Sequence, residues 1–85
     1  MPLYIIERHF AEQLELTKEA VDAIKAINFE EESRWLFSFL SPDKKKTFCL
    51  YEAPSIQAIQ KAAARAGVPA DVITEVTEIH PEAFV

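Results

Sequence analysis

Apolar and polar residues follow one another along the chain with two different periods, and these periods predict the order of its elements. Segments 3–10, 33–40, 47–52 and 72–79 are rich in β-branched and aromatic residues and alternate with the two-residue period of a strand. The segments after the first and third strands instead carry apolar residues at three- and four-residue spacing, which predicts amphipathic helices. The expected order is strand, helix, strand, strand, helix, strand.

Capping residues and a turn mark where these elements end. Thr17 and Ser55 suit helix N-caps, because their hydroxyl groups can accept a free backbone N–H of the first turn. The first helix is expected to end near Asn28, and the second at Gly67, the only glycine of the chain. Residues 41–44 contain the proline and aspartate of a tight turn, so the second and third strands are expected to form a hairpin.

This order of elements predicts a ferredoxin-like βαββαβ fold of the α+β class. Right-handed crossovers would place the first and third strands in the middle of a four-stranded antiparallel-type sheet, with both helices on one face. The 85 residues are expected to form a single domain, 1–85, because no linker or internal repeat divides them.

Neither face of the predicted sheet is polar. Strict alternation places Trp35, Phe37 and Phe39 on one face of the second strand, and the third strand has apolar residues on both faces. Hydrophobic residues make up 49% of the chain, which is more than a small core readily covers. The pattern therefore predicts a homodimer that packs sheet against sheet into an α+β barrel. The alternative is a set of scattered, exposed apolar residues.

Charge and cysteine content narrow the classes of partner and the location. Fourteen acidic residues against nine basic ones give a net charge of −5, which argues against binding to nucleic acid or to an anionic membrane surface. No apolar run approaches the roughly 20 residues of a membrane span. The single cysteine cannot form an internal disulfide and the first residues do not resemble a secretion signal, so a cytoplasmic location is expected.

A few residues have side chains that could carry chemistry. Cys49 with His9 could form a nucleophile and base, although a cysteine inside an apolar strand is more often a small buried residue. Glu7, His9 and Cys49 offer oxygen, nitrogen and sulfur donors for a nickel-, copper- or zinc-type ion. No CxxC, HxxxH or HExxH element supports such a site. The alternative for Glu7 is an ion pair with Arg8 or Arg34.

Several segments together form a pattern that is shared with a known family. They are residues 4–8, Trp35 with Ser38 and Phe39, residues 48–55 running into Ala58 and Ile59, residues 64–70, and residues 73–76. Through these segments the chain resembles a small bacterial family of domains of unknown function that includes nickel-binding proteins of ferredoxin-like fold. The resemblance implies a dimeric α+β barrel and, in some members, a metal site with donors from several strands and a helix.

The chain departs from this family at two positions where relatives carry a histidine. One lies two residues after the tryptophan of the second strand and the other midway along the second helix, and here these positions hold Phe37 and Ala63. Metal binding by this chain would then depend on Glu7, His9 and Cys49. The more apolar interior suits a small organic ligand instead.

Three functions are compatible with this sequence. The first is a homodimeric protein that binds a small apolar molecule or a nickel-type metal ion. Its pocket would lie between the second helix and the sheet, lined by Glu7, Trp35, Phe37, Cys49 and Tyr51. The second is a small cofactor-independent enzyme of the monooxygenase or isomerase type, with His9 or Glu7 as acid or base. The third is an interaction module without chemistry.

Overall fold

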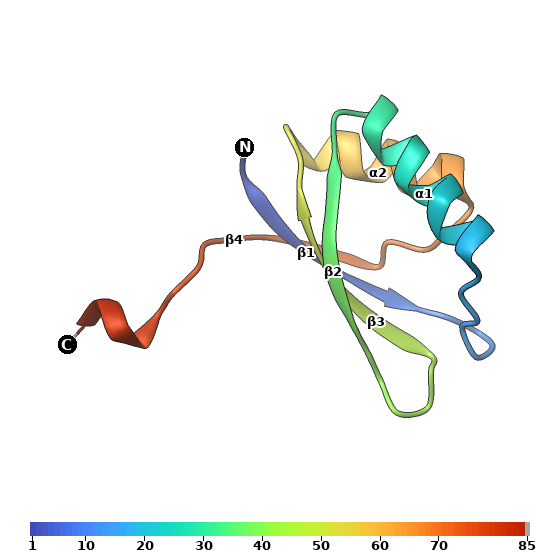
Figure 1. The fold of residues 1–85 in the computed structure, drawn as a ribbon, viewed down its shortest axis with the longest axis horizontal. Helices are drawn as coiled ribbons and strands as arrows, with labels where there is room; N and C mark the ends of the chain where they lie inside the picture. Colours follow the sequence, from blue (N-terminus) through green and yellow to red (C-terminus); the bar gives the residue numbers. More distant parts are fainter. Residues whose placement is uncertain (85) are drawn as a thin grey trace.

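The structure is a computed structural model that describes residues 1–84, and its elements follow the predicted order (Figure 1). The strands are β1 (Leu3–His9), β2 (Arg34–Leu40), β3 (Lys46–Glu52) and β4 (Val72–Val76); the helices are α1 (Lys18–Glu30), α2 (Ile56–Ala66) and a short 3₁₀ helix, η1 (Pro81–Phe84). The sheet has the order β2-β3-β1-β4 and every neighbouring pair is antiparallel. The ferredoxin-like α+β fold, with β1 and β3 in the middle, is therefore confirmed.

The helix starts and the end of α2 lie where the capping residues predicted them. Thr17 Oγ1 accepts a hydrogen bond from the backbone N–H of Ala20 at 3.1 Å, and Ser55 Oγ accepts one from that of Ala58 at 3.2 Å. Gly67 ends α2 with a φ of 69°, in the left-handed region that favours glycine.

The first helix continues past Asn28, where the sequence pattern predicts its end. The Asn28 carbonyl oxygen accepts the backbone N–H groups of Glu31 and Ser33, at 3.1 and 2.8 Å. Its side chain is buried and donates from Nδ2 to the Tyr51 hydroxyl at 3.1 Å. Asn28 is thus a polar anchor between α1 and β3, and the helix runs on to Glu30.

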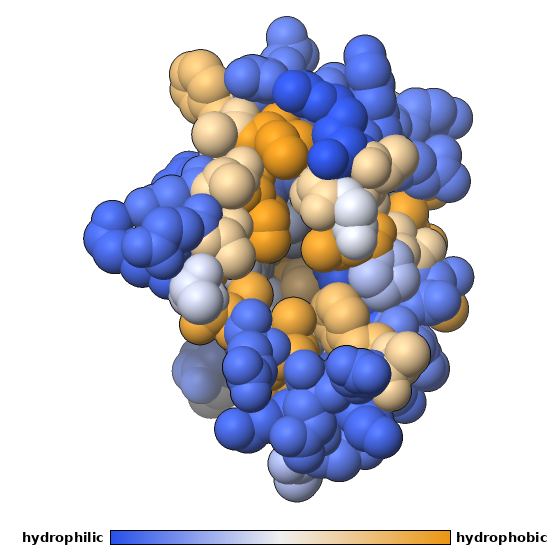
Figure 2. All heavy atoms as spheres, turned by 90° about the vertical axis from the view of Figure 1, so that its right-hand side faces the viewer, coloured by the Kyte–Doolittle hydropathy of each residue, from blue (hydrophilic) through white to orange (hydrophobic). Residues whose placement is uncertain are grey.

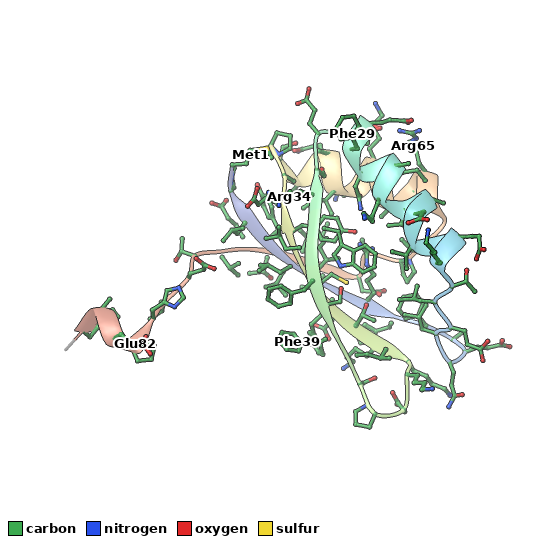
Figure 3. The ribbon with its side chains drawn as sticks, in the orientation of Figure 1. Met1, Phe29, Arg34, Phe39, Arg65 and Glu82 are labelled. Carbon is green, nitrogen blue, oxygen red and sulfur yellow. The ribbon has the colours of Figure 1, made fainter. Side chains whose placement is uncertain are left out.

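The core fills the layer between the helices and one face of the sheet (Figure 3). Its central contacts are cross-strand pairs, with Tyr4 opposite Tyr51 and Ile6 opposite Cys49. Ile59 of α2 packs against them and is 1% exposed. Because β1 and β3 lie in the middle of the sheet, their inward side chains form the floor on which any site on this face is built.

A β-bulge in β2 separates aromatic residues that strict alternation places together. The register shifts between Trp35 and Phe37, so that Trp35 lies opposite Tyr51 while Phe37 lies opposite Leu50. One extra residue reverses the alternation of side chains along the strand. Trp35 therefore faces the helices, and Phe37 and Phe39 face the other side of the sheet. The prediction that all three aromatic residues share one face was wrong.

The sheet face opposite the helices is uncovered in a single chain and is largely apolar. We call it the open face. It also carries the polar residues Glu7, His9, Lys46, Glu52 and Thr74, and its apolar residues are Leu3, Ile5, Phe37, Phe39, Phe48, Leu50, Val72 and Val76. Phe37 and Phe39 are 52% and 64% exposed, and their rings meet edge to face with centroids 5.6 Å apart. Apolar residues therefore lie on both faces of the sheet, as the sequence pattern predicts.

The last strand is shorter than the predicted segment 72–79. Val76, the last residue of β4, pairs with Leu3, the first residue of β1. If the strand continued, Thr77 would face Pro2, which has no N–H to donate. Residues 77–84 leave the sheet, extend away from the body of the molecule and are exposed (Figure 1). Among residues 1–84, the structure contains no helix with the length and apolar character needed to cross a membrane.

Candidate functional site

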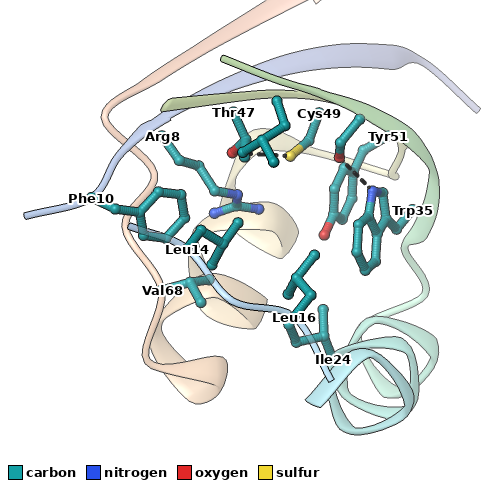
Figure 4. Close-up of a pocket in the computed structure, with 12 residues that line it drawn as sticks. Arg8, Phe10, Leu14, Leu16, Ile24, Trp35, Thr47, Cys49, Tyr51 and Val68 are labelled. Carbon is teal, nitrogen blue, oxygen red and sulfur yellow. Dashed lines mark hydrogen bonds between the residues drawn. The ribbon is translucent and has the colours of Figure 1, made fainter. Parts of the chain in front are cut away.

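A pocket of about 270 Å³ lies between the sheet and the segments that cover it on the helix side (Figure 4). It is lined from β1 and the loop that follows by Arg8, Phe10, Leu14 and Leu16, from α1 by Ile24, from β2 by Trp35, Ser38 and Leu40, from β3 by Thr47, Cys49 and Tyr51, and from the loop before β4 by Val68. In the view of Figure 2, hydrophobic residues surround a hollow on the side of the molecule where α1 and the loop between β1 and α1 lie. The walls are mostly apolar, with a few polar groups among them.

The floor of the pocket comes from alternate residues of β3. Thr47, Cys49 and Tyr51 are separated by two residues each, so their side chains point to the same face. All three are buried, and the Cys49 thiol lies 3.6 Å from Thr47 Oγ1, to which it donates. The bulge in β2 adds Trp35 beside them, and its indole N–H donates to Ser38 Oγ at 2.7 Å.

The cover of the pocket is the loop between β1 and α1. The backbone N–H of Phe10 donates to the Lys45 carbonyl oxygen at 2.8 Å, and that of Leu14 donates to the Lys44 carbonyl oxygen at 2.7 Å. These bonds fix the loop to the hairpin of β2 and β3, so that Leu14 and Leu16 lie along the pocket. Sequence reasoning missed this role, although two leucines in an otherwise polar loop were a signal that it is not fully solvated.

Arg8 supplies a positive charge inside this apolar pocket. The residue is only 6% exposed, its Nη1 donates to the Pro69 carbonyl oxygen, and its guanidinium carbon lies 5.8 Å from the centroid of the Tyr51 ring. The sequence interpretation considered Arg8 only as a partner of Glu7. The signal for its true position was the alternation of β1, which places Arg8 on the same face as Tyr4 and Ile6.

Tyr51 carries a phenol that stays protonated at neutral pH. Burial raises the pKa of the Tyr51 hydroxyl above its ordinary value of 10.0, although the nearby charge of Arg8 and the hydrogen bond from Asn28 act in the opposite direction. The pocket thus combines a guanidinium, a neutral phenol, a thiol and small hydroxyl groups. These groups can orient a ligand by hydrogen bonds while the apolar walls exclude water.

A polar cluster lies on the open face itself, toward the end of β1. His9 Nε2 lies 3.0 Å from Glu7 Oε1, and Lys46 Nζ lies 3.5 Å from the same oxygen. Glu7 therefore pairs with His9 and Lys46 and not with Arg8 or Arg34. This cluster is on the side of the sheet that faces away from the pocket.

The structure divides the predicted pocket residues between the two faces of the sheet. Trp35, Cys49 and Tyr51 line the pocket, whereas Glu7 and Phe37 lie on the opposite face, the latter because of the bulge. The pocket also lies beneath α1 and the loop before it, and not beneath α2 as the sequence pattern indicated. The five residues do not form one site.

The predicted metal donors are divided in the same way. Glu7 and His9 are together on one face, while Cys49 is buried on the other. Within residues 1–84, no group of three or more histidine, cysteine, aspartate and glutamate side chains is close enough to hold a metal ion. The donors of a single chain do not fit a resident nickel-type ion.

Comparison with known proteins places the chain in a family. A crystal structure of SCO4226 from Streptomyces coelicolor A3(2) matches with a TM-score of 0.78 and 25% sequence identity, over 92% of this chain and 99% of that chain. A search of curated proteins gave no match. Residues 4–76, which span all four strands and both α-helices but not the extended C-terminal residues, match the family described as nickel responsive protein SCO4226-like. The chain therefore belongs to the SCO4226-like family of nickel responsive proteins.

Proposed function

We propose that this protein binds a small organic molecule in the pocket above β3, and that it does so as a homodimer. The observation that carries the proposal is the pocket itself: a volume of about 270 Å³, mostly apolar walls and a small number of polar groups that converge on it. Ligand sites in proteins commonly have this composition. The pocket is also built from residues far apart in sequence, so its shape depends on the whole fold.

A metal ion suits this pocket less well than an organic ligand. Nickel, copper and zinc bind to imidazole, thiolate and carboxylate groups, and Cys49 is the single side chain of these types among the described residues that line the pocket. A site with one such donor lacks the three or four ligands that these ions require. The name of the family concerns nickel, but the pocket of this chain does not provide a nickel centre.

Catalysis by the predicted acid or base is also less favoured than binding. A general base must lie within hydrogen-bond reach of its substrate. His9 and Glu7, the expected candidates, pair with each other on the far side of the sheet from the pocket. A molecule held beside Tyr51 and Cys49 would therefore be out of their reach.

The open face supports a second copy of the chain as the partner. Face-to-face packing of two sheets would bury its exposed phenylalanine rings between layers about 10 Å apart. The outer residues of β3 are basic at one end, Lys46, and acidic at the other, Glu52. A two-fold axis perpendicular to this strand would reverse its direction in the second copy and bring Lys46 of one chain near Glu52 of the other, which favours such a dimer.

The pocket can be tested with octanol, a neutral molecule of suitable size, and with Trp35 as the reporter. Trp35 is the only tryptophan and lines the pocket, so a bound hydrocarbon should shift its fluorescence. We expect saturable binding that weakens by about tenfold, or 1.4 kcal/mol, when Val68→Phe fills part of the pocket.

The matched control for this experiment is Val72→Phe. It makes the same change on the open face, and we expect it to leave the affinity for octanol within about twofold of the wild type, because Val72 does not line the pocket. Urea unfolding of both variants shows that they are folded. Equal affinities for the wild type and the Val68→Phe variant would contradict the proposal. A linear, unsaturable response both to octanol and to octanoate, its carboxylate analogue, would also contradict it.

A further inference from the structure

A buried arginine without an acidic partner faces the pocket. Arg8 is 6% exposed, and within residues 1–84 no carboxylate lies within ion-pair distance of it. A guanidinium group remains charged in proteins and carries five N–H donors. Burial of such a group without a counter-charge is costly, and charged residues are rarely buried unless they are paired.

No fully buried side-chain nitrogen lacks a hydrogen-bond partner among the described residues, but the protein provides no counter-charge for this group. Nη1 donates to the Pro69 carbonyl oxygen, and the Tyr51 ring lies under the guanidinium, with its centroid 5.8 Å from the Arg8 Cζ atom. The close-up in Figure 4 shows the guanidinium group pointing among the pocket residues, between Phe10 and Tyr51. Since neither Pro69 nor Tyr51 carries a negative charge, the charge of Arg8 is left for a ligand to neutralise.

The rest of the pocket sets the shape of that ligand. A volume of about 270 Å³ restricts the ligand to a small molecule. Most of the remaining lining is aliphatic or aromatic, including Leu14, Leu16 and Ile24. A ligand with a second charge would leave that charge unpaired against these apolar side chains.

From these observations we propose that the ligand is a small apolar monocarboxylate, whose carboxylate pairs with the Arg8 guanidinium and whose hydrocarbon part lies against the aliphatic wall. This inference rests on the proposed ligand-binding function and names its ligand class. Two parallel N–H groups of an arginine match the two oxygens of a carboxylate. The Tyr51 hydroxyl, which lies on the same floor, can donate a further hydrogen bond to the bound anion.

The test compares ligands that differ only in the head group. Octanoate, octanol and octylamine are titrated into the wild-type protein at pH 7.5 and 0.15 M salt, with Trp35 fluorescence and calorimetry as readouts. We expect octanoate to bind at least about tenfold more tightly than octanol, and octylamine to bind more weakly than octanol, because Arg8 attracts an anion and repels a cation. This order is measured on the wild type, so it does not depend on whether a variant folds.

Two variants then assign the preference to Arg8. Arg8→Gln should reduce the affinity for octanoate to within about twofold of that for octanol, whereas Arg8→Lys, which keeps the charge but not the fork of donors, should retain part of the preference. Arg34→Gln makes the same change at an exposed arginine of β2 and should leave the preference intact.

The outcomes separate this inference from the proposed function. If octanol binds and octanoate binds no better, or if the Arg34→Gln variant loses the preference as fully as the Arg8→Gln variant, the carboxylate inference is wrong while the pocket remains a ligand site. If neither octanol nor octanoate binds, the proposed function itself is wrong. Tighter binding of octylamine than of octanoate would also overturn the assignment.

Discussion

Tyr51, on the inner face of the sheet, contributes both to the stability of the protein and to the lining of its pocket. The Tyr51 hydroxyl accepts a hydrogen bond from Asn28, its ring lies beneath Arg8, and the residue is 3% exposed. One side chain thus joins β3 to α1 and lies beside the charged group of the pocket. Because burial raises the pKa of Tyr51, its deprotonation is coupled to unfolding.

The phenol predicts a loss of stability at alkaline pH. The unfolded chain releases the Tyr51 proton near pH 10, whereas the folded chain holds it to a higher pH. Its contribution to the free energy of unfolding is therefore complete below pH 10 and is lost as the pH rises through the raised pKa of the folded state. In urea unfolding between pH 8 and pH 11, Tyr51→Phe should show a shallower decline above pH 10 than the wild type.

At neutral pH the same substitution should cost about 1 to 2 kcal/mol of stability, because the Asn28 amide loses its buried partner. Tyr4→Phe is the control, since Tyr4 lies opposite Tyr51 on the same face of the sheet. An alkaline decline in the Tyr51→Phe variant as steep as that of the wild type would show that another group titrates.

Residue-level prediction from the sequence succeeded for some pocket residues and failed for others for identifiable reasons. Trp35, Cys49 and Tyr51 were placed in the pocket, but Phe37 was not separated from Trp35 because a bulge leaves no mark in a pattern of apolar residues. Arg8 was on the correct face by alternation alone. It was overlooked because a charged residue is expected at the surface, whereas the fold buries it beneath the loop and against Tyr51.

At the scale of elements, the ends of helices depend on contacts that lie far away in the sequence. The sequence of residues 30–32 is typical of a solvated acidic turn. In the structure, Arg65 of α2 donates hydrogen bonds to Glu30 and Glu31, and the distance from Arg65 Nη1 to Glu31 Oε2 is 2.9 Å. The hydrogen bond from Arg65 lowers the pKa of the Glu31 carboxyl. A local pattern contains no information about a partner on another helix, so neither this contact nor the extension of α1 could be predicted.

The end of α2, in contrast, is determined by the backbone conformation of Gly67. The effect of a substitution at this residue on the stability of the protein can therefore be predicted. Gly67 has a φ of 69°, and apart from the glycine itself and its two chain neighbours nothing lies within 4 Å of the place where a Cβ would be added. Gly67→Ala should therefore destabilise the protein by about 1 kcal/mol through backbone strain alone. The measurement is the urea midpoint at an unchanged slope.

Gly67→Asn provides the matched comparison, since asparagine adopts the left-handed conformation more readily than alanine does. We expect its loss of stability to be the smaller of the two. If alanine and asparagine cost the same, or if alanine costs nothing, the left-handed cap does not limit the stability of α2.

At the scale of the whole molecule, the fold leaves one face of the sheet uncovered. The helices, the loop after β1 and the pocket occupy one face of the sheet, while the open face has no cover within residues 1–84 (Figure 1). The sequence predicted the excess of apolar residues but could not separate a partner from scattered exposed side chains. The structure places apolar residues of all four strands side by side on the open face, which is typical of an interaction surface, while others such as Phe29, Ile79 and Phe84 are exposed singly elsewhere.

This surface leads to the prediction that a charge on the open face will disrupt the dimer. Phe39 is 64% exposed in a single chain and lies opposite Phe48 in β3, so a second sheet would bury it. Phe39→Lys would place an unpaired ammonium group between the sheets, which is costly. In sedimentation experiments at micromolar concentration, we expect the wild type to be a dimer. The dissociation constant of the Phe39→Lys dimer should be at least about thirtyfold higher, because the loss of an interface residue that contributes about 2 kcal/mol changes the constant by this factor.

Phe29→Lys is a stringent control for this prediction, because Phe29 is 83% exposed but lies on α1, away from the open face. It lowers surface hydrophobicity by the same substitution and should leave the dimer unchanged. Dissociation of the Phe29→Lys variant, with the Phe39→Lys variant still dimeric, would place the interface on the helix side instead. A wild-type protein that sediments as a monomer would mean that the open face does not bind a second copy, while octanoate binding to the pocket, which lies on the opposite side of the sheet, would be unaffected.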